Sequence, residues 1–146
     1  PQGQIWLGKR FGEDGPYCWQ CPQGGIDKGE APKKAAKREL FEETGLRATK
    51  MEYLGRIKPW LYYQFPPEIR SAKYKKYGHI GQRQKWFAFR YDGDGSDVDL
   101  KAHGPQEFST WKWADLHTIA DTTVPFKRAV YERLITEFAP FASPVK

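Results

Sequence analysis

The stretch at residues 24–46, GGIDKGEAPKKAAKRELFEETGL, constrains the fold of this chain more than any other segment. Apolar side chains recur in it at helical spacing, and a proline stands where the first helical turn would begin. Gly45 is a typical helix C-cap, because glycine adopts a left-handed backbone without steric cost. The pattern predicts a helix over residues 31–44, entered through the tight turn that Gly24 and Gly25 allow.

Three carboxylates share one face of this expected helix. Glu39 lies three residues before Glu42 and four before Glu43, so the side chains fall within an arc of roughly 100°. Such clustering is unfavourable unless cations neutralise it, and Mg²⁺ is commonly bound by a few carboxylates together with substrate phosphates. Arg38 lies one turn before Glu42 and can orient a carboxylate. The spacing predicts a divalent-metal site, with a solvated helix face as the alternative.

The rest of the chain interleaves short strands with one further helix. The segments with strand character are residues 4–8, 19–23, 51–57, 60–65, 84–91 and 108–113. Residues 84–91, QKWFAFRY, carry bulky and nearly continuous apolar side chains, which favours a central strand. Apolar residues at helical spacing predict a last helix over residues 125–138. We therefore expect a layered α/β domain with a mixed β-sheet between helices.

Length, charge and cysteine content limit the classes of protein. A chain of 146 residues fits a single domain. No apolar run approaches a transmembrane helix and no signal peptide is evident, so we expect an intracellular protein that does not enter a membrane. The net charge of +6 predicts an anionic partner without identifying it. Cys18 and Cys21 lack the second ligand pair of a usual zinc site, so we expect buried free thiols.

The stretch at residues 24–46 resembles the Nudix box, G-x5-E-x7-R-E-U-x-E-E-x-G-U with U an aliphatic residue. Every fixed position is present: Gly24, Glu30, Arg38, Glu39, Leu40, Glu42, Glu43, Gly45 and Leu46. A chance match at so many positions is negligible. The chain is therefore identified as a Nudix hydrolase, which implies the Nudix fold, an α/β/α sandwich with a mixed sheet between helices.

The same resemblance implies the chemistry of the acidic face. In Nudix enzymes the residues that match Glu39, Glu42 and Glu43 bind the metal ions, and one of them often acts as the base. Arg38 belongs to the same catalytic set. The cofactor implied is Mg²⁺, with Mn²⁺ as a substitute, and the reaction is attack by a metal-activated water on one phosphorus atom.

Landmarks outside the box resemble a narrower group, the bacterial RNA pyrophosphohydrolases and the asymmetric diadenosine tetraphosphate hydrolases of bacteria and plants. These landmarks are WQCPQGGID at residues 19–27, IGQRQKWF at 80–87, EFSTWKW at 107–113 and VPFKRAVY at 124–131. The resemblance covers nearly the whole chain. It implies a cytoplasmic protein of bacteria or a plant organellar one, without an obligate protein partner.

The group also implies residues that bind substrate. Glu107 matches a loop carboxylate that adds a metal ligand, and Phe126 matches an aromatic that packs on a nucleobase, although a core position is an equal alternative. The residues that match positions near the phosphate chain are Arg10, Gln23, Gln82 and Lys85. Tyr74 and Tyr77 are further candidates for contacts with phosphate or RNA, with a solvent-facing loop as the alternative.

Two departures from the group affect what can be carried over. Cys21 stands where the group usually has phenylalanine, and we expect this change to affect packing more than chemistry. Relatives also carry a strand ahead of the turn at Pro1, with an arginine implicated in phosphate binding. Residues 1–146 are therefore expected to form one Nudix domain that lacks the family's first strand, with reduced activity as a consequence.

Three functions are compatible with these residues. The first is hydrolysis of the 5′-triphosphate of RNA to a 5′-monophosphate, and the second is cleavage of diadenosine tetraphosphate to ATP and AMP. The third is a non-catalytic module that binds RNA or nucleotides, which the intact Glu39, Glu42 and Glu43 disfavour. The basic stretch at residues 70–76 favours RNA, because neutralising several backbone phosphates requires a distributed cationic surface.

Overall fold

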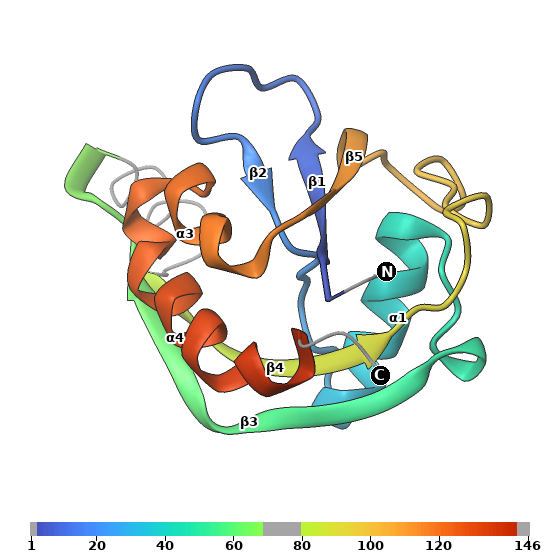
Figure 1. The fold of residues 1–146 in the computed structure, drawn as a ribbon. Helices are drawn as coiled ribbons and strands as arrows, with labels where there is room; N and C mark the ends of the chain where they lie inside the picture. Colours follow the sequence, from blue (N-terminus) through green and yellow to red (C-terminus); the bar gives the residue numbers. More distant parts are fainter. Residues whose placement is uncertain (1–2, 69–79, 143–146) are drawn as a thin grey trace.

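The structure, a computed structural model, describes residues 3–68 and 80–142. Its strands form two antiparallel sheets (Figure 1). In the first, β1 (Ile5–Arg10) lies between β2 (Trp19–Gln20) and β5 (Phe108–Ala114). In the second, β3 (Glu52–Gln64) pairs with β4 (Gly81–Arg90). Every strand pair among the described residues is antiparallel, so the parallel pair of a mixed sheet is not among them.

The helices lie on both sides of the first sheet (Figure 1). The α-helices are α1 (Pro32–Thr44), α3 (Ile119–Thr122) and α4 (Arg128–Phe138). The 3-10 turns are η1 (Ala48–Lys50), η2 (Leu116–Thr118), η3 (Pro125–Lys127) and η4 (Ala139–Ala142). The short α3 was not expected from the sequence. Among the described residues, no helix has both the length and the apolar character needed to cross a membrane.

Both helices expected from the sequence are confirmed. Helix α1 begins at a proline and ends at Gly45, whose φ of 79° is left-handed and whose N–H donates to the Phe41 carbonyl at 2.8 Å. The C-terminal helix begins as the 3-10 turn η3 and continues as α4, with Val130, Tyr131 and Leu134 buried. The apolar periodicity was sufficient here because these helices bury one face against the sheets.

The strand character expected for residues 51–57 and 60–65 is confirmed, but the two segments are continuous. They form the single strand β3, interrupted by an irregular register between Ile57 and Leu61. Strand β4 pairs with β3 and has no second strand neighbour among the described residues, so the described part of its sheet leaves it at an edge. Its bulky apolar side chains pack instead on helices and around a cavity, and the Trp86 ring meets the Tyr131 ring of α4 at 6.1 Å.

A buried hydrogen bond joins α4 to the segment that leads into the glycine turn. The Tyr131 side chain is fully buried, and its hydroxyl accepts the backbone N–H of Cys21 at 2.8 Å. Cys18 and Cys21 are both free and buried, which confirms the expectation of buried free thiols. Burial raises the pKa of the Cys21 thiol to about 12, so this thiol stays protonated at neutral pH.

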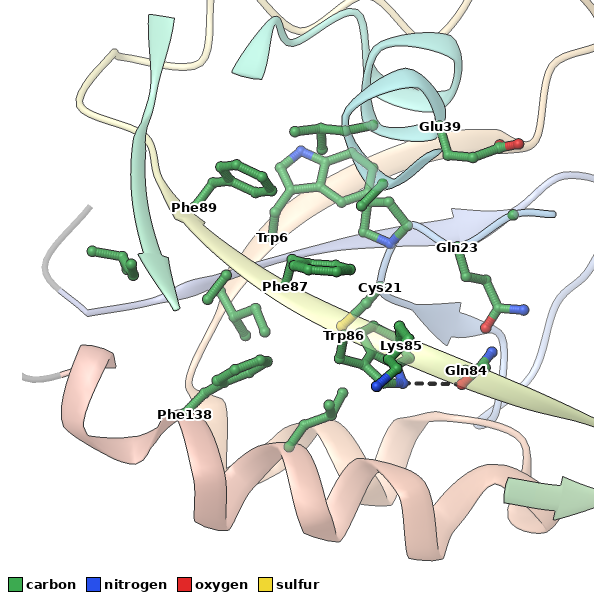
Figure 2. Close-up of a pocket in the computed structure, with 18 of the residues that line it drawn as sticks. Trp6, Cys21, Gln23, Glu39, Gln84, Lys85, Trp86, Phe87, Phe89 and Phe138 are labelled. Atoms are coloured by element: carbon green, nitrogen blue, oxygen red, sulfur yellow. Dashed lines mark hydrogen bonds between the residues drawn. The ribbon is translucent and has the colours of Figure 1, made fainter. Parts of the chain in front are cut away.

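A cavity of about 1220 Å³ lies between the two sheets (Figure 2). Its apolar part includes Phe87, Phe89 and Phe138, and its polar end includes Gln23 and Glu39. Every residue of β4 lines it, on the side where this strand has no partner among the described residues. Protein interiors leave few voids larger than a water molecule, so this space has room for a further strand beside β4.

A first prediction concerns this space. An N-terminal extension that carries an apolar β-strand is expected to raise the thermal unfolding midpoint by at least about 5 °C, because it would bury apolar side chains against the open edge of β4. Thermal unfolding followed by circular dichroism measures the effect. The control is an extension of equal length whose apolar residues are replaced by serine. Equal midpoints for the two extensions would contradict docking in the cavity.

Candidate active site

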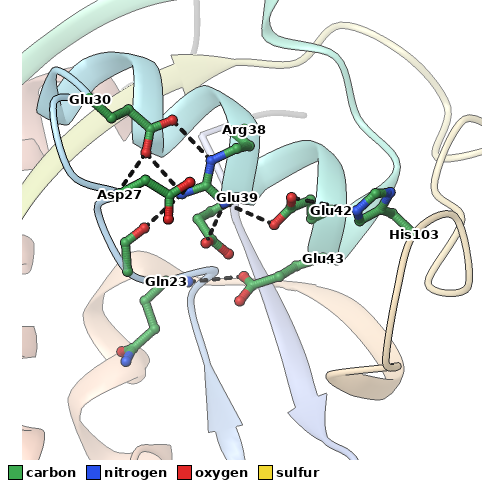
Figure 3. A network of polar contacts seen from close by, with 9 residues as sticks. Gln23, Asp27, Glu30, Arg38, Glu39, Glu42, Glu43 and His103 are labelled. Carbon is green, nitrogen blue, oxygen red and sulfur yellow. Dashed lines mark hydrogen bonds and ion pairs between the residues drawn. The ribbon is translucent and has the colours of Figure 1, made fainter.

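Arg38 holds together the glycine turn and the acidic face of α1 (Figure 3). Its Nη1 donates to Glu39 at 2.8 Å and to Glu42 at 3.0 Å. Its Nε and Nη2 both donate to the Glu30 carboxylate at 2.9 Å, and Nη2 also donates to the Gly25 carbonyl at 2.8 Å. These partners hold the pKa of Arg38 above its ordinary value. The loop and the helix are therefore fixed relative to each other through one guanidinium group.

The turn before α1 is shaped by the same contacts. The Glu30 carboxylate accepts the Asp27 N–H at 3.0 Å, and its hydrogen bonds with Arg38 lower the pKa of Glu30 to about 2. A Cβ at position 24 would overlap the carboxyl group of Glu39, so any other residue there would displace this acidic side chain. Gly24 thus leaves room for the Glu39 side chain. This role is separate from the backbone freedom that glycine gives to a turn.

Glu43 is the most buried of the acidic side chains, with 5% of its surface exposed. Its carboxylate accepts the Gln23 N–H at 3.0 Å. Burial, followed by the charges of Glu39 and Glu107, raises the pKa of Glu43 to about 9. Burial also raises the pKa of Glu39. The structure thus brings Glu39 and Glu43 close enough for their charges to interact, and burial disfavours the ionised form of both.

The donor set fits a hard divalent cation. It contains carboxylate oxygens, which Mg²⁺ prefers, and a buried acid whose ionised form needs a compensating charge. Among residues 3–68 and 80–142, no three Asp, Glu, His or Cys side chains form a ready-made metal cage. Arg38 pairs with one oxygen of Glu39 and one of Glu42. Mg²⁺ does not require a protein cage, because it keeps waters and takes substrate phosphates as ligands.

Lys127 is a site residue that the sequence reasoning missed. Only 7% of it is exposed, and its Nζ donates to the side-chain oxygens of Gln23 at 3.2 Å and Gln20 at 3.4 Å. Burial, followed by the charge of Arg10, lowers the pKa of Lys127 to about 8. In the sequence, the only indication of a role for Lys127 was its position next to Phe126. The ammonium group provides a positive charge next to the segment that contacts Glu43.

His103 was also missed from the sequence. Its Nε2 lies 3.6 Å from a Glu42 oxygen, on an exposed loop before β5 (Figure 3). The residues around His103 in the sequence do not indicate this contact with Glu42, because the contact depends on how the loop returns over α1. A backbone bond, from the Phe11 N–H to the Glu107 carbonyl at 2.8 Å, anchors the end of the same loop beside β1.

The predicted substrate-binding residues are distributed around this group. Gln23 and Lys85 line one cavity with Glu39 (Figure 2). Gln82 accepts a hydrogen bond from the Tyr63 hydroxyl. Arg10 faces the β1–β2 connection, where it pairs with Glu13 and donates to the Tyr17 carbonyl at 3.2 Å. Tyr74, Tyr77 and the basic residues 70–76 lie outside the described residues.

Phe126 has features of both alternatives considered for it. Its ring meets those of Tyr63 at 5.6 Å and Phe65 at 6.0 Å, as a core residue would. Its side chain is nevertheless only partly buried and stands next to Lys127. An aromatic ring with one packed face and partial exposure is compatible with stacking on a base.

Comparison with known proteins connects this geometry to a family. The NUDIX domain model matches residues 1–134. An RNA pyrophosphohydrolase of Caulobacter vibrioides is 46% identical over 149 aligned positions, which cover 100% of this chain and 86% of the relative. An RNA pyrophosphohydrolase of Acidiphilium cryptum is 47% identical over 144 positions, which cover 96% of this chain and 84% of the relative.

A solved structure shows the same fold. The binary complex of a C. elegans Ap4A hydrolase superposes with a TM-score of 0.65 at 23% identity, over 94% of this chain and 85% of the other. At this level of identity the likeness concerns the fold. It confirms the α/β class and the Nudix fold expected from the box.

A second prediction concerns the proton held by Glu43. Its pKa is raised on folding from 4.5 to about 9, so the stability it contributes is complete below pH 4.5 and is lost as the pH rises through about 9. Glu43→Gln cannot ionise and should therefore stabilise the metal-free protein, by at least about 1 kcal/mol at the upper end of this range.

Urea unfolding in the presence of a chelator, at a series of pH values, measures this difference. Glu68→Gln is the matched control, because Glu68 is an exposed carboxylate away from the acidic face. A wild-type protein and a Glu43→Gln variant with parallel pH profiles would show that Glu43 is ionised at neutral pH without a cation.

Proposed function

This chain belongs to the Nudix family, and we propose that it hydrolyses the 5′-triphosphate end of RNA to a 5′-monophosphate end. The observation that carries the proposal is the likeness, along the full chain, to curated proteins named RNA pyrophosphohydrolase. The intact Glu39, Glu42 and Glu43 on α1 support an enzyme rather than a binding module, since a module without catalysis has no need of this acidic set. The bacterial sources of these relatives favour the cytoplasm as its location.

The cation that we assign to the acidic face is Mg²⁺, with Mn²⁺ as a substitute, held by Glu39, Glu42, Glu43 and Glu107. When bound, it supplies a Lewis acid for the phosphate oxygens and an activated water. Arg38 keeps Glu39 and Glu42 on one side of the helix. Glu39, Glu42 and Glu43 all lie on this face, and we assign to one of them the proton of the attacking water.

The remaining residues are assigned to the phosphate chain. Lys127 presents its amine beside Gln23, and Lys85 lines a cavity together with Gln23, so both can neutralise phosphate oxygens outside the acidic face. Phe126 is assigned to the first base, where its partly exposed ring can stack. Cleavage of diadenosine tetraphosphate would use the same groups, because it presents a similar phosphate chain to the same carboxylates.

A third prediction separates these two substrates. Triphosphorylated RNA should exceed diadenosine tetraphosphate in kcat/KM, and this advantage should shrink as salt rises, because contacts beyond the first nucleotide are mainly electrostatic. Parallel kinetics at equal Mg²⁺ and at low and high salt measure the ratio. Preference for the dinucleotide at low salt would overturn the RNA assignment and identify an asymmetric dinucleotide hydrolase.

A fourth prediction tests the acidic face directly. Glu42→Gln should lower turnover by at least about 100-fold, because a charged ligand is lost while the helix keeps its length and packing. Release of pyrophosphate from triphosphorylated RNA measures turnover, and circular dichroism checks the fold. Glu68→Gln, which changes charge by the same amount on the surface, should keep normal turnover. A near-normal rate in Glu42→Gln would refute the assignment of this face.

A further inference from the structure

The open end of the β3–β4 sheet points to a second contact with RNA. We propose that Lys58, Trp60, Tyr62 and Arg83, the β3–β4 platform, bind the nucleotides that follow the 5′ end. The proposal rests on the proposed function, since it takes RNA as the substrate. It adds a place for the body of the strand, which none of the acidic or phosphate-binding residues provides.

Charge is concentrated in this part of the chain. Residues 55–90 contain nine lysines and arginines and a single acid, Glu68. The net charge of the whole chain is only +6, so the remainder of the protein is net negative. The positive field therefore originates from one β-hairpin region and not from the surface as a whole. A polyanion that approaches the protein is attracted to this region first.

The platform cations are not used in ion pairs. Among the described residues, Lys58 and Arg83 have no carboxylate partner, and the same holds for their neighbour Lys85. Arginines elsewhere behave differently, since Arg128 and Arg133 each pair with an acid on their own helix. The platform cations are thus available to phosphate groups without the loss of an existing ion pair.

An irregularity in β3 positions the aromatic part of the platform. Ile57 pairs with Trp86 and Leu61 with Gln84, so three residues of β3 lie opposite Lys85 alone. Extra residues of this kind bend a strand and redirect its side chains. Lys85 Nζ donates to the Lys58 carbonyl inside the irregular segment. The redirected Trp60 ring lies 4.5 Å from the Arg83 Cζ and 5.0 Å from Lys85 Nζ.

Tyr62 extends this surface by one more ring. It lies directly across the strand pair from Arg83, and 67% of its surface is exposed. Aromatic rings flanked by unpaired cations match the chemistry of single-stranded nucleic acid, where bases stack on rings and phosphates meet cations. An acidic peptide would use the cations but would leave the half-buried Trp60 ring and the exposed Tyr62 ring without a function.

The platform is continuous with the acidic face. Trp60, Arg83 and Lys85 line the same cavity as Gln23 and Glu39. Figure 2 shows Lys85 on β4 opposite Gln23, with Glu39 beyond it on α1. A strand whose 5′ phosphates reach Glu39 can therefore leave the site across Lys85 onto the platform. All four platform residues are proposed to contact nucleotides downstream of the reacting 5′ end. Substituting them should therefore change the affinity for long RNA and not the rate of the chemical step.

The test compares RNAs of different length. Triphosphorylated oligonucleotides of two and about eight nucleotides share one 5′ sequence, and KM is measured for each. The wild type should have a lower KM for the longer RNA, whereas Trp60→Ala/Tyr62→Ala should raise that KM about tenfold and change the KM of the dinucleotide less than about twofold. Trp60→Phe/Tyr62→Phe, which keeps both rings, should restore most of the length dependence.

Tyr17→Ala is the control for loss of an exposed ring, because Tyr17 is 48% exposed on the β1–β2 connection and lies outside the platform. It should behave as the wild type at both lengths. Arg83→Gln should reduce the slope of log affinity against log salt by about one for the long RNA. Equal length dependence in the wild type and the double alanine variant, with both proteins folded by circular dichroism, would overturn the platform.

A binding measurement keeps the platform separate from the proposed function. Fluorescence anisotropy with a single-stranded RNA that has a 5′-hydroxyl end reports the platform without any hydrolysis. Weaker binding by the double alanine variant supports the platform even if triphosphate ends are not hydrolysed. Binding of a poly-glutamate peptide that falls by the same factor in that variant would overturn RNA as the partner.

Discussion

The arrangement of this site depends on a single guanidinium group. Arg38 contacts Glu30, Glu39 and Glu42, and its bond to the Gly25 carbonyl joins the turn to the helix. Without it, three acidic side chains of the same loop and helix would repel one another with no compensating charge nearby. The arginine also competes for the oxygens that a divalent cation would use. The same oxygens of Glu39 and Glu42 therefore serve the ion pairs with Arg38 and lie on the face assigned to the cation.

Glu43 differs from its neighbours because Arg38 does not reach it. Its partner is the Gln23 N–H, a neutral donor, and burial opposes its ionisation. A cation that binds here replaces a proton, so metal binding and proton release are coupled. Gln23 connects this acid to Lys127 through its side chain. One short segment between β2 and α1 therefore contacts both the acidic and the basic groups of the site.

The sequence predicted local features well and long-range ones poorly. Helix α1, its proline start and its Gly45 cap follow from residues close in sequence, and the acidic face follows from the helix. Lys127 could not be found in this way, because its role arises from a fold that brings residues 127 and 23 together. The neighbours of β4 could not be predicted for a related reason, since bulky apolar residues indicate burial but do not identify the element that buries them.

Opposite charges at two parts of one cavity impose an order on binding. The basic β3–β4 region attracts a polyanion, but the carboxylates of α1 repel its phosphates until a cation neutralises them. Phosphates and cation therefore each raise the affinity for the other, and this coupling is reciprocal. A polyanion held only by the basic region would remain bound but unreacted. Under the proposed function, selectivity for a phosphorylated end follows from the acidic face, because the phosphates of such an end are themselves ligands for a cation held there.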